Sequence, residues 1–243
     1  MTVPPRTPAE RPAVILLHGS VVNGRMWDPI VPRITPTHRV FTPDLPGHGS
    51  RRNEPYTVAS AAAAVQELVG SLAPSQVVLV GDSLGSYTAM AAAPALGDRL
   101  AGAVLAGATA NFRGLTAIAM GLRSALFRIF PKDRLQRILE SRVAREFEAG
   151  PAMVEDGLRP DAFGEAVASL RGIDFRPLLA GIAAPVLLVN GTRDRLARRD
   201  EASFLAAARR GSLELFPGVG HGVSIIKPAE YARLIAEFLN SLN

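Results

Sequence analysis

The stretch Val77-Val78-Leu79-Val80-Gly81-Asp82-Ser83-Leu84-Gly85 combines an apolar run with a turn bounded by two glycines. Its first four residues are typical of a parallel strand that is buried on both faces. A G-x-S-x-G turn follows at once, and Ser86-Tyr87-Thr88-Ala89-Met90 can continue as a helix. This order of strand, sharp turn and helix is the context in which a serine serves as a nucleophile.

The glycines of this turn have a physical reason. Side chains two residues either side of Ser83 would collide with the neighbouring strand and helix, so Gly81 and Gly85 leave the space that the turn needs. The turn would hold the Ser83 hydroxyl at a helix N-terminus, where the dipole and free amides favour developing negative charge. The pattern predicts Ser83 as a nucleophile, with an ordinary glycine turn as the alternative.

Six strand-like runs alternate with helical stretches along the chain. The runs are residues 14–17, 40–42, 77–80, 104–105, 186–190 and 213–216. The Ala- and Leu-rich stretches between and after them are residues 58–72, 84–93, 201–208 and 228–242. Such alternation predicts an α/β fold with a mostly parallel, doubly wound sheet and helices on both faces.

One segment interrupts this alternation. Residues 111–179 contain no convincing strand, and Leu135, Ile138, Leu139 and Val143 follow helical spacing. We therefore expect residues 1–110 and 180–243 to form the core, with residues 111–179 as a helical insertion. Residues 111–148 carry eight basic and four acidic side chains. An excess of positive charge can indicate a cationic lid for anionic substrates. Here the charges are spread around the helices, which favours a solvated helix surface instead.

Length and composition restrict the class of protein. The 243 residues, 48% of them hydrophobic, suffice for one domain with a full core. The net charge is +5, but 25 of the 27 basic residues are scattered arginines and only 6% of residues are aromatic. We therefore expect no nucleic-acid partner. The absence of cysteine excludes a disulfide, a thiolate metal site and a cysteine nucleophile.

The amino-terminal segment lacks the apolar stretch of a secretory signal, because residues 1–12 are rich in proline and include charged side chains. The longest apolar runs are far shorter than the roughly 20 residues that span a bilayer. We expect a soluble, cytoplasmic protein without a membrane partner.

A serine nucleophile needs a base, and histidine is the side chain best matched to neutral pH. His221 lies in Gly218-Val219-Gly220-His221-Gly222, a turn directly after the last predicted strand, and is predicted as that base. His38 lies in a polar stretch and is expected to face solvent. His18 and His48 belong to turns, where a structural hydrogen bond is the expected role.

The base in turn needs a carboxylate that fixes its tautomer. Asp194 follows the penultimate strand, and the order Ser83, Asp194, His221 is that of nucleophile, acid and base in one family of triads. Asp200 is a second candidate, but it stands where the next helix should begin and is more simply an N-cap. A purely structural role for Asp194 in its loop is the alternative.

Taken together, these motifs resemble the α/β-hydrolase fold family, over nearly the whole chain. The resemblance is to a serine-nucleophile, esterase- or lactonase-like member with a helical cap, which the insertion at residues 111–179 would supply. It implies that the backbone N–H groups of Ser20 and Leu84 form the oxyanion hole. Besides the Ser83 turn, the matching motifs are Leu16-Leu17-His18-Gly19-Ser20, Asp44-Leu45-Pro46-Gly47-His48-Gly49-Ser50, Asn190-Gly191-Thr192-Arg193-Asp194 and Gly220-His221-Gly222.

The chain also departs from the family pattern. Asp82 stands where a histidine or an aromatic residue is more usual, and Ser86 replaces a frequent glycine. Only about a dozen residues precede the first strand, so one or both of the family's leading antiparallel strands are expected to be missing. Serine at the nucleophile position argues against epoxide hydrolases and haloalkane dehalogenases, which use a carboxylate there.

The sequence thus predicts hydrolysis of a carboxylic ester or lactone with an apolar part, through an acyl-serine intermediate, with no cofactor and no metal. Thioester or carbon–carbon bond hydrolysis by the same triad stays open, as does a ligand-binding or sensor protein with little turnover. Apolar residues of the insertion can line an acyl pocket or simply form core; they are Leu115, Ile118, Leu122, Leu126, Phe127 and Phe130.

Overall fold

The computed structural model describes residues 7, 8, 10–72, 76–129 and 131–242. Its centre is a six-stranded sheet in the order β2-β1-β3-β4-β5-β6, in which every neighbouring pair is parallel. The strands are β1 (Ala13–Leu17), β2 (Val40–Phe41), β3 (Val77–Asp82), β4 (Leu100–Ala106), β5 (Val186–Gly191) and β6 (Gly211–Phe216). The predicted parallel sheet is confirmed.

Alternating side chains of the central strands enter two separate cores. Ile15, Leu79 and Leu105 pack on one face of the sheet, whereas Leu16 and Val80 pack on the other. Because successive residues of a strand point to opposite faces, a continuous apolar run serves both cores at once. This explains why the strands are apolar without alternation.

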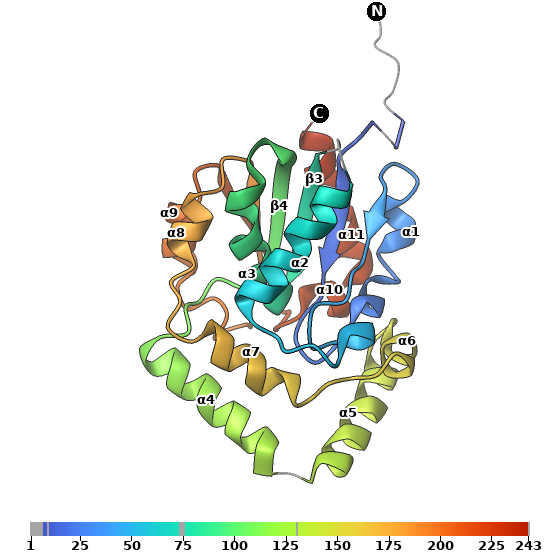
Figure 1. The fold of residues 1–243 in the computed structure, drawn as a ribbon, viewed down its shortest axis with the longest axis vertical. Helices are drawn as coiled ribbons and strands as arrows, with labels where there is room; N and C mark the ends of the chain where they lie inside the picture. Colours follow the sequence, from blue (N-terminus) through green and yellow to red (C-terminus); the bar gives the residue numbers. More distant parts are fainter. Residues whose placement is uncertain (1–6, 9, 73–75, 130, 243) are drawn as a thin grey trace, which may run out of the picture.

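Helices cover both faces of the sheet (Figure 1). One face packs against α2 (Val58–Ser71), α3 (Leu84–Ala92), α8 (Arg176–Ala180) and α9 (Glu201–Ala207). The other face packs against α1 (Val31–Ile34), α10 (Val223–Ile226) and α11 (Pro228–Ser241). A Thr57–Ser60 capping box begins α2. The helices predicted from sequence begin where the structure has them and end within a residue or two of its bounds.

Of the five described helices between β4 and β5 in the chain, the first four form one group. They are α4 (Gly114–Ile129), α5 (Lys132–Glu146), α6 (Gly150–Glu155) and α7 (Ala162–Leu170). Figure 1 shows them as a layer across one end of the sheet, with α4 packed against α7 and α5 against α6. Helix α8 also precedes β5, but its Leu179 is buried in the core of the α2 face. The division into a core and a cap at residues 111 and 179 stays a prediction.

The strand order reverses at β1. From β1 the chain moves outward to β2, and it then crosses to β3 on the other side of β1. The loops that follow β1 and β3 therefore diverge at the carboxyl ends of the strands, which is where open α/β sheets bind their ligands.

Two predictions concern features beyond the sheet. Within the described residues, no strand precedes β1 and no helix has the length and apolar character to cross a bilayer. The prediction for residues 1–12 falls in part on residues 1–6 and 9, which lie outside the described ranges.

Candidate active site

Ser83 occupies a tight turn between β3 and α3. Its backbone has φ 50° and ψ −109°, a conformation that few non-glycine residues adopt. A Cβ at Gly81 would come within 2.6 Å of the Gly85 carbonyl carbon, and one at Gly85 would overlap the Leu17 carbonyl group. The Ser83 N–H donates to the Ala106 carbonyl at 2.8 Å, which ties the turn to the end of β4. Gly81 and Gly85 are therefore required because any side chain there would collide with the neighbouring backbone, as the sequence indicated.

His221 lies beside Ser83, although 138 positions separate them in sequence. Its loop joins β6 to α10, and the distance from Ser83 Oγ to His221 Nε2 is 2.9 Å. The glycine after β4, Gly107, makes room for the ring, because a Cβ there would come within 3.1 Å of His221 Cε1. About half of the His221 side chain stays exposed.

Asp194 completes the hydrogen-bonded chain. Its Oδ2 lies 2.6 Å from His221 Nδ1, and its Oδ1 accepts from the Ala197 N–H at 3.0 Å. Because an ionised carboxylate only accepts, Nδ1 carries the proton and Nε2 is free to accept from the Ser83 hydroxyl. Burial acts to raise the pKa of Asp194, but the His221 hydrogen bond and charge and the amides of Ala197 and Leu196 outweigh it, so this pKa is lowered.

Backbone hydrogen bonds hold the acid and base loops together. The Arg193 N–H donates to the Val219 carbonyl at 2.8 Å, and the Gly218 N–H donates to Thr192 Oγ1 at 2.8 Å. A Cβ at Gly191 would overlap the backbone of Val219. The two loops therefore depend on close backbone approach at the ends of β5 and β6.

A cavity of about 350 Å³ opens over Ser83 and His221. Its walls come from the loops after β1, β3, β4, β5 and β6 and from α4, α5 and α7. Most of the side chains that form these walls are apolar, and the larger ones include Met26, Tyr87, Phe112, Met120, Leu139, Phe147 and Phe163. No Lys or Arg occurs among the described residues that line it.

The loop after β1 brings Ser20 to this cavity. Its neighbour Val21 has φ 75°, and among the described residues Val21 and Ser83 are the two non-glycine residues with positive φ. For a β-branched residue this conformation is strained, and such strain concentrates at functional sites. Leu84 is the first residue of α3, so its N–H has no acceptor within the helix. The oxyanion role of Ser20 and Leu84 stays a prediction.

Two of the insertion residues that the sequence suggested do not line the cavity. Ile118 and Leu122 are 57% and 64% exposed, so neither lines the cavity. Thr116 and Met120, on the opposite side of α4, line it instead. The side chains of Leu115, Leu126, Phe127 and Phe130 lie outside what the structure describes.

The side chains of the other three histidines make their contacts with residues other than Ser83. His38 does not face solvent as expected: it is buried, with Nδ1 2.9 Å from Thr37 Oγ1. His18 Nε2 accepts from the Leu45 N–H at 2.9 Å, so its Nδ1–H donates to the Gly19 carbonyl at 2.7 Å. His48 is also buried, and its ring packs edge-on against His18. Both turn histidines make structural hydrogen bonds or ring contacts.

Asp200 stands at the N-cap position of α9, but its side chain does not cap the helix. The Asp200 carboxylate instead accepts from the Asn111 N–H at 2.9 Å. Asp200 therefore occupies the predicted N-cap position, but the predicted capping hydrogen bond of its side chain is absent.

Sequence reasoning missed the contacts made by Asp82 and Tyr87, which flank the Ser83 turn. Asp82 accepts a hydrogen bond from the Ser224 hydroxyl at 2.6 Å, and Tyr87 donates to the Ala110 carbonyl at 2.6 Å. In the sequence, the unusual Asp82 was the only sign of these two hydrogen bonds, because Ser224 and Ala110 are distant in sequence from Asp82 and Tyr87. Gly107, at the end of a predicted strand, could have been recognised as a place of close approach.

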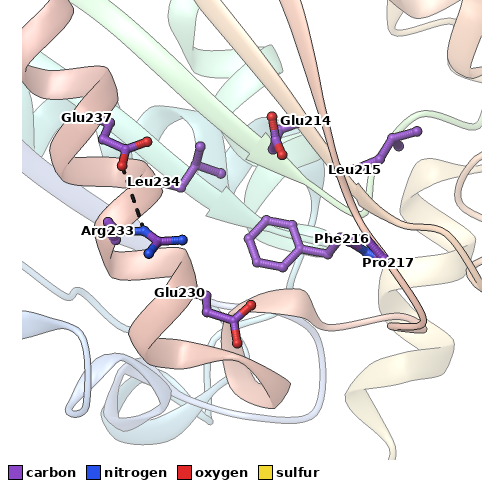
Figure 2. Close-up of a pocket in the computed structure, with 8 residues that line it drawn as sticks. All are labelled: Glu214, Leu215, Phe216, Pro217, Glu230, Arg233, Leu234 and Glu237. Atoms are coloured by element: carbon purple, nitrogen blue, oxygen red, sulfur yellow. Dashed lines mark ion pairs between the residues drawn. The ribbon is translucent and has the colours of Figure 1, made fainter.

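A second cavity, of about 270 Å³, lies between β6 and α11 (Figure 2). Three glutamates and Arg233 surround Phe216 there, and Arg233 pairs with Glu237 at 3.7 Å. None of the described residues that line it is a serine, threonine or histidine. The cavity over Ser83 is therefore the candidate active site. Among the described residues, no group of three or more His, Asp or Glu side chains is placed to hold a metal.

Comparison with known proteins defines the class. The family model of the alpha/beta hydrolase family matches residues 14–234. The chain belongs to the α/β hydrolase family, and it is a hydrolase enzyme.

Particular relatives agree with this assignment. The chain is 28% identical to a pimeloyl-[acyl-carrier protein] methyl ester esterase of Edwardsiella ictaluri, over 93% of this chain and 92% of that protein. Its structure is similar to that of E-2-(acetamidomethylene)succinate hydrolase, with a TM-score of 0.79 and 22% identity over 94% and 91% of the two chains. The enol-lactonase of Burkholderia xenovorans LB400 has a TM-score of 0.76 and 22% identity over 95% and 92%. These structural likenesses show the fold.

Proposed function

We propose that this hydrolase cleaves carboxylic esters or lactones through an acyl-serine intermediate, with Ser83 as nucleophile, His221 as base and Asp194 as orienting acid. The observation that carries the proposal is the continuous hydrogen-bonded chain from Ser83 Oγ through His221 to Asp194, open to an apolar cavity. The name of the Edwardsiella relative, a methyl ester esterase, supports an ester as substrate.

The geometry supports the following steps. His221 Nε2 takes the proton of Ser83 Oγ as this oxygen attacks the carbonyl carbon. The N–H groups of Ser20 and Leu84 stabilise the resulting oxyanion, and the imidazolium then gives its proton to the departing alkoxide. A water molecule, deprotonated by His221, attacks the acyl carbon; the bond to Ser83 Oγ breaks, the acid is released, and the imidazolium returns its proton to Oγ. Asp194 holds the tautomer throughout and stabilises the imidazolium.

The cavity favours an uncharged, apolar acyl or alkyl group. Its walls are mostly aliphatic and aromatic, and the charged groups that line it are acidic or belong to His221. A substrate carboxylate in this cavity would find no Lys or Arg among the described lining residues and would meet Asp82 and Asp194. We therefore expect neutral esters to be preferred over esters of dicarboxylic acids.

A substrate panel tests the proposal. We expect the purified protein to hydrolyse p-nitrophenyl esters of short and medium chain, or lactones of similar size, and Ser83→Ala to lower kcat/KM by more than about a thousandfold. A thioester series in the same assay distinguishes thioester hydrolysis. Turnover that survives in Ser83→Ala would contradict the mechanism, and a protein that binds these compounds without turnover would favour the sensor alternative.

A further inference from the structure

Asp82 and Ser224 form a second link between the segments that carry Ser83 and His221. Asp82 is the last residue of β3 and directly precedes Ser83, whereas Ser224 lies in α10, just after His221. The Ser224 hydroxyl donates to Asp82 Oδ2 at 2.6 Å, and both side chains are buried. The same two segments are thus joined once through the imidazole and once through this pair.

The length and burial of this bond indicate a strong interaction. Hydroxyl-to-carboxylate bonds of 2.5–2.7 Å are charge-assisted and are stronger than neutral ones. Burial raises the pKa of Asp82, while His221 and Ser224 act in the opposite direction and Asp194 adds to the increase. Burial, together with the charge of Asp82, raises the pKa of Tyr231 in α11. Removing the Asp82 carboxylate would leave the Ser224 hydroxyl buried without this hydrogen bond, whereas removing the hydroxyl would leave Asp82 the backbone N–H of Ser224.

The loop that carries His221 has reason to need such a link. It contains three glycines, of which Gly218 and Gly222 have φ of 73° and 79°. The imidazole itself is half exposed, so packing restrains it weakly. A buried anchor two residues beyond Gly222 fixes the far end of the loop.

Asp82 does not orient the imidazole directly, because Asp194 and Ser83 already occupy its two ring nitrogens. We propose that Asp82 is a positioning residue that acts through Ser224 to hold the His221 loop against the nucleophile turn. This inference rests on the proposed function, since it takes His221 as the base of Ser83.

A double-mutant cycle tests the proposal. The rate constant for modification of Ser83 by a fluorophosphonate is measured for the wild type, Asp82→Ala, Ser224→Ala and the double variant. Each single change removes one charge-assisted hydrogen bond and is expected to slow the reaction about tenfold. Because both changes remove the same bond, the double variant is expected to react no more slowly than the slower single variant. Asp82→Asn keeps an acceptor oxygen and is expected to fall between Asp82→Ala and the wild type.

A matched control and an activity-independent measurement accompany the cycle. Ser169→Ala removes a hydroxyl that accepts from the Val58 N–H at 2.8 Å and does not line the cavity, so this variant is expected to react like the wild type. Amide hydrogen exchange should accelerate over residues 218–226 in Ser224→Ala and not in Ser169→Ala. Circular dichroism establishes that each variant is folded.

The outcomes separate the two hypotheses. Suppose that Ser83 is labelled in the wild type. If the two single changes then have no effect on the labelling rate or have effects that add up in the double variant, or if exchange over residues 218–226 is unchanged, the role of Asp82 is overturned and the proposed function stands. A folded wild type whose Ser83 is never labelled overturns the proposed function, and with it the role of Asp82.

Discussion

Asp194 and Asp200 follow the same strand but make different contacts. Asp194 bonds to the imidazole, whereas Asp200 accepts from the Asn111 N–H. Asp194→Asn loses the charge and the correct tautomer, so we expect kcat to fall about 10⁴-fold. Asp200→Asn is the matched control and should retain activity. Steady-state hydrolysis of a p-nitrophenyl ester measures both, and similar losses in the two variants would show that Asp194 has no special role.

The strained backbone of Ser83 makes a second prediction. At φ 50° and ψ −109° a glycine is unstrained, whereas alanine keeps the cost of a Cβ. Both substitutions remove the hydroxyl, so their difference isolates the strain. Urea unfolding should show Ser83→Gly to be more stable than Ser83→Ala by about 1 kcal/mol. Equal stabilities would mean that the turn carries no strain.

The local sequence predicts where a site residue lies when that position follows from the direction of the strand before it. The parallel strands bring their carboxyl ends to one edge, so Ser83, Asp194 and His221 could be placed together from sequence alone. His38 could not, because its polar neighbours suggested solvent while tertiary packing buries it. The partner of Asp82 also depends on tertiary structure, since Ser224 is 142 positions away.

Helix α4 offers a matched pair of substitutions for testing the acyl pocket. Met120 is buried in the cavity wall, whereas Ile118 is 57% exposed on the same helix. Met120→Ala enlarges the pocket, so we expect kcat/KM for p-nitrophenyl octanoate to rise severalfold relative to the butyrate. Ile118→Ala should leave this ratio unchanged. An unchanged ratio in Met120→Ala would exclude α4 from substrate binding.

The strands were predicted well, because each contains a run of apolar residues. Apolar runs gave all six strands, although β4 begins at Leu100, four residues before the predicted start. Its first residues include Gly102, which lies against Phe238 and has little strand propensity of its own. Helical periodicity revealed the insertion but not which side of α4 meets the cavity, because a periodic pattern does not identify the partner of a face.

The whole molecule should lose stability on mild acidification because of His18. Burial, with a smaller effect of nearby His48, lowers the pKa of His18 to about 3. In the unfolded chain histidine binds a proton below about pH 6.5, so between these values the unfolded state holds more protons and stability falls as pH falls. The free energy of unfolding should decrease by about 3 kcal/mol from pH 7 to pH 4 through this group.

Urea unfolding at several pH values measures this dependence. His18→Gln removes the titrating group and should flatten the decrease, while the lowered pKa values of His38 and His48 keep part of it. A decrease of the same size in His18→Gln would show that His18 does not carry the effect.

The six-stranded sheet places the candidate active site, because its strand reversal at β1 opens the edge where Ser83 and His221 meet. The most direct test is reaction of the folded protein with a fluorophosphonate, followed by mass mapping of the adduct. We predict a single adduct at Ser83 in the wild type, and its loss in His221→Ala. An unreactive Ser83 in the folded wild type, or equal labelling in His221→Ala, would contradict the assignment of a serine nucleophile activated by His221.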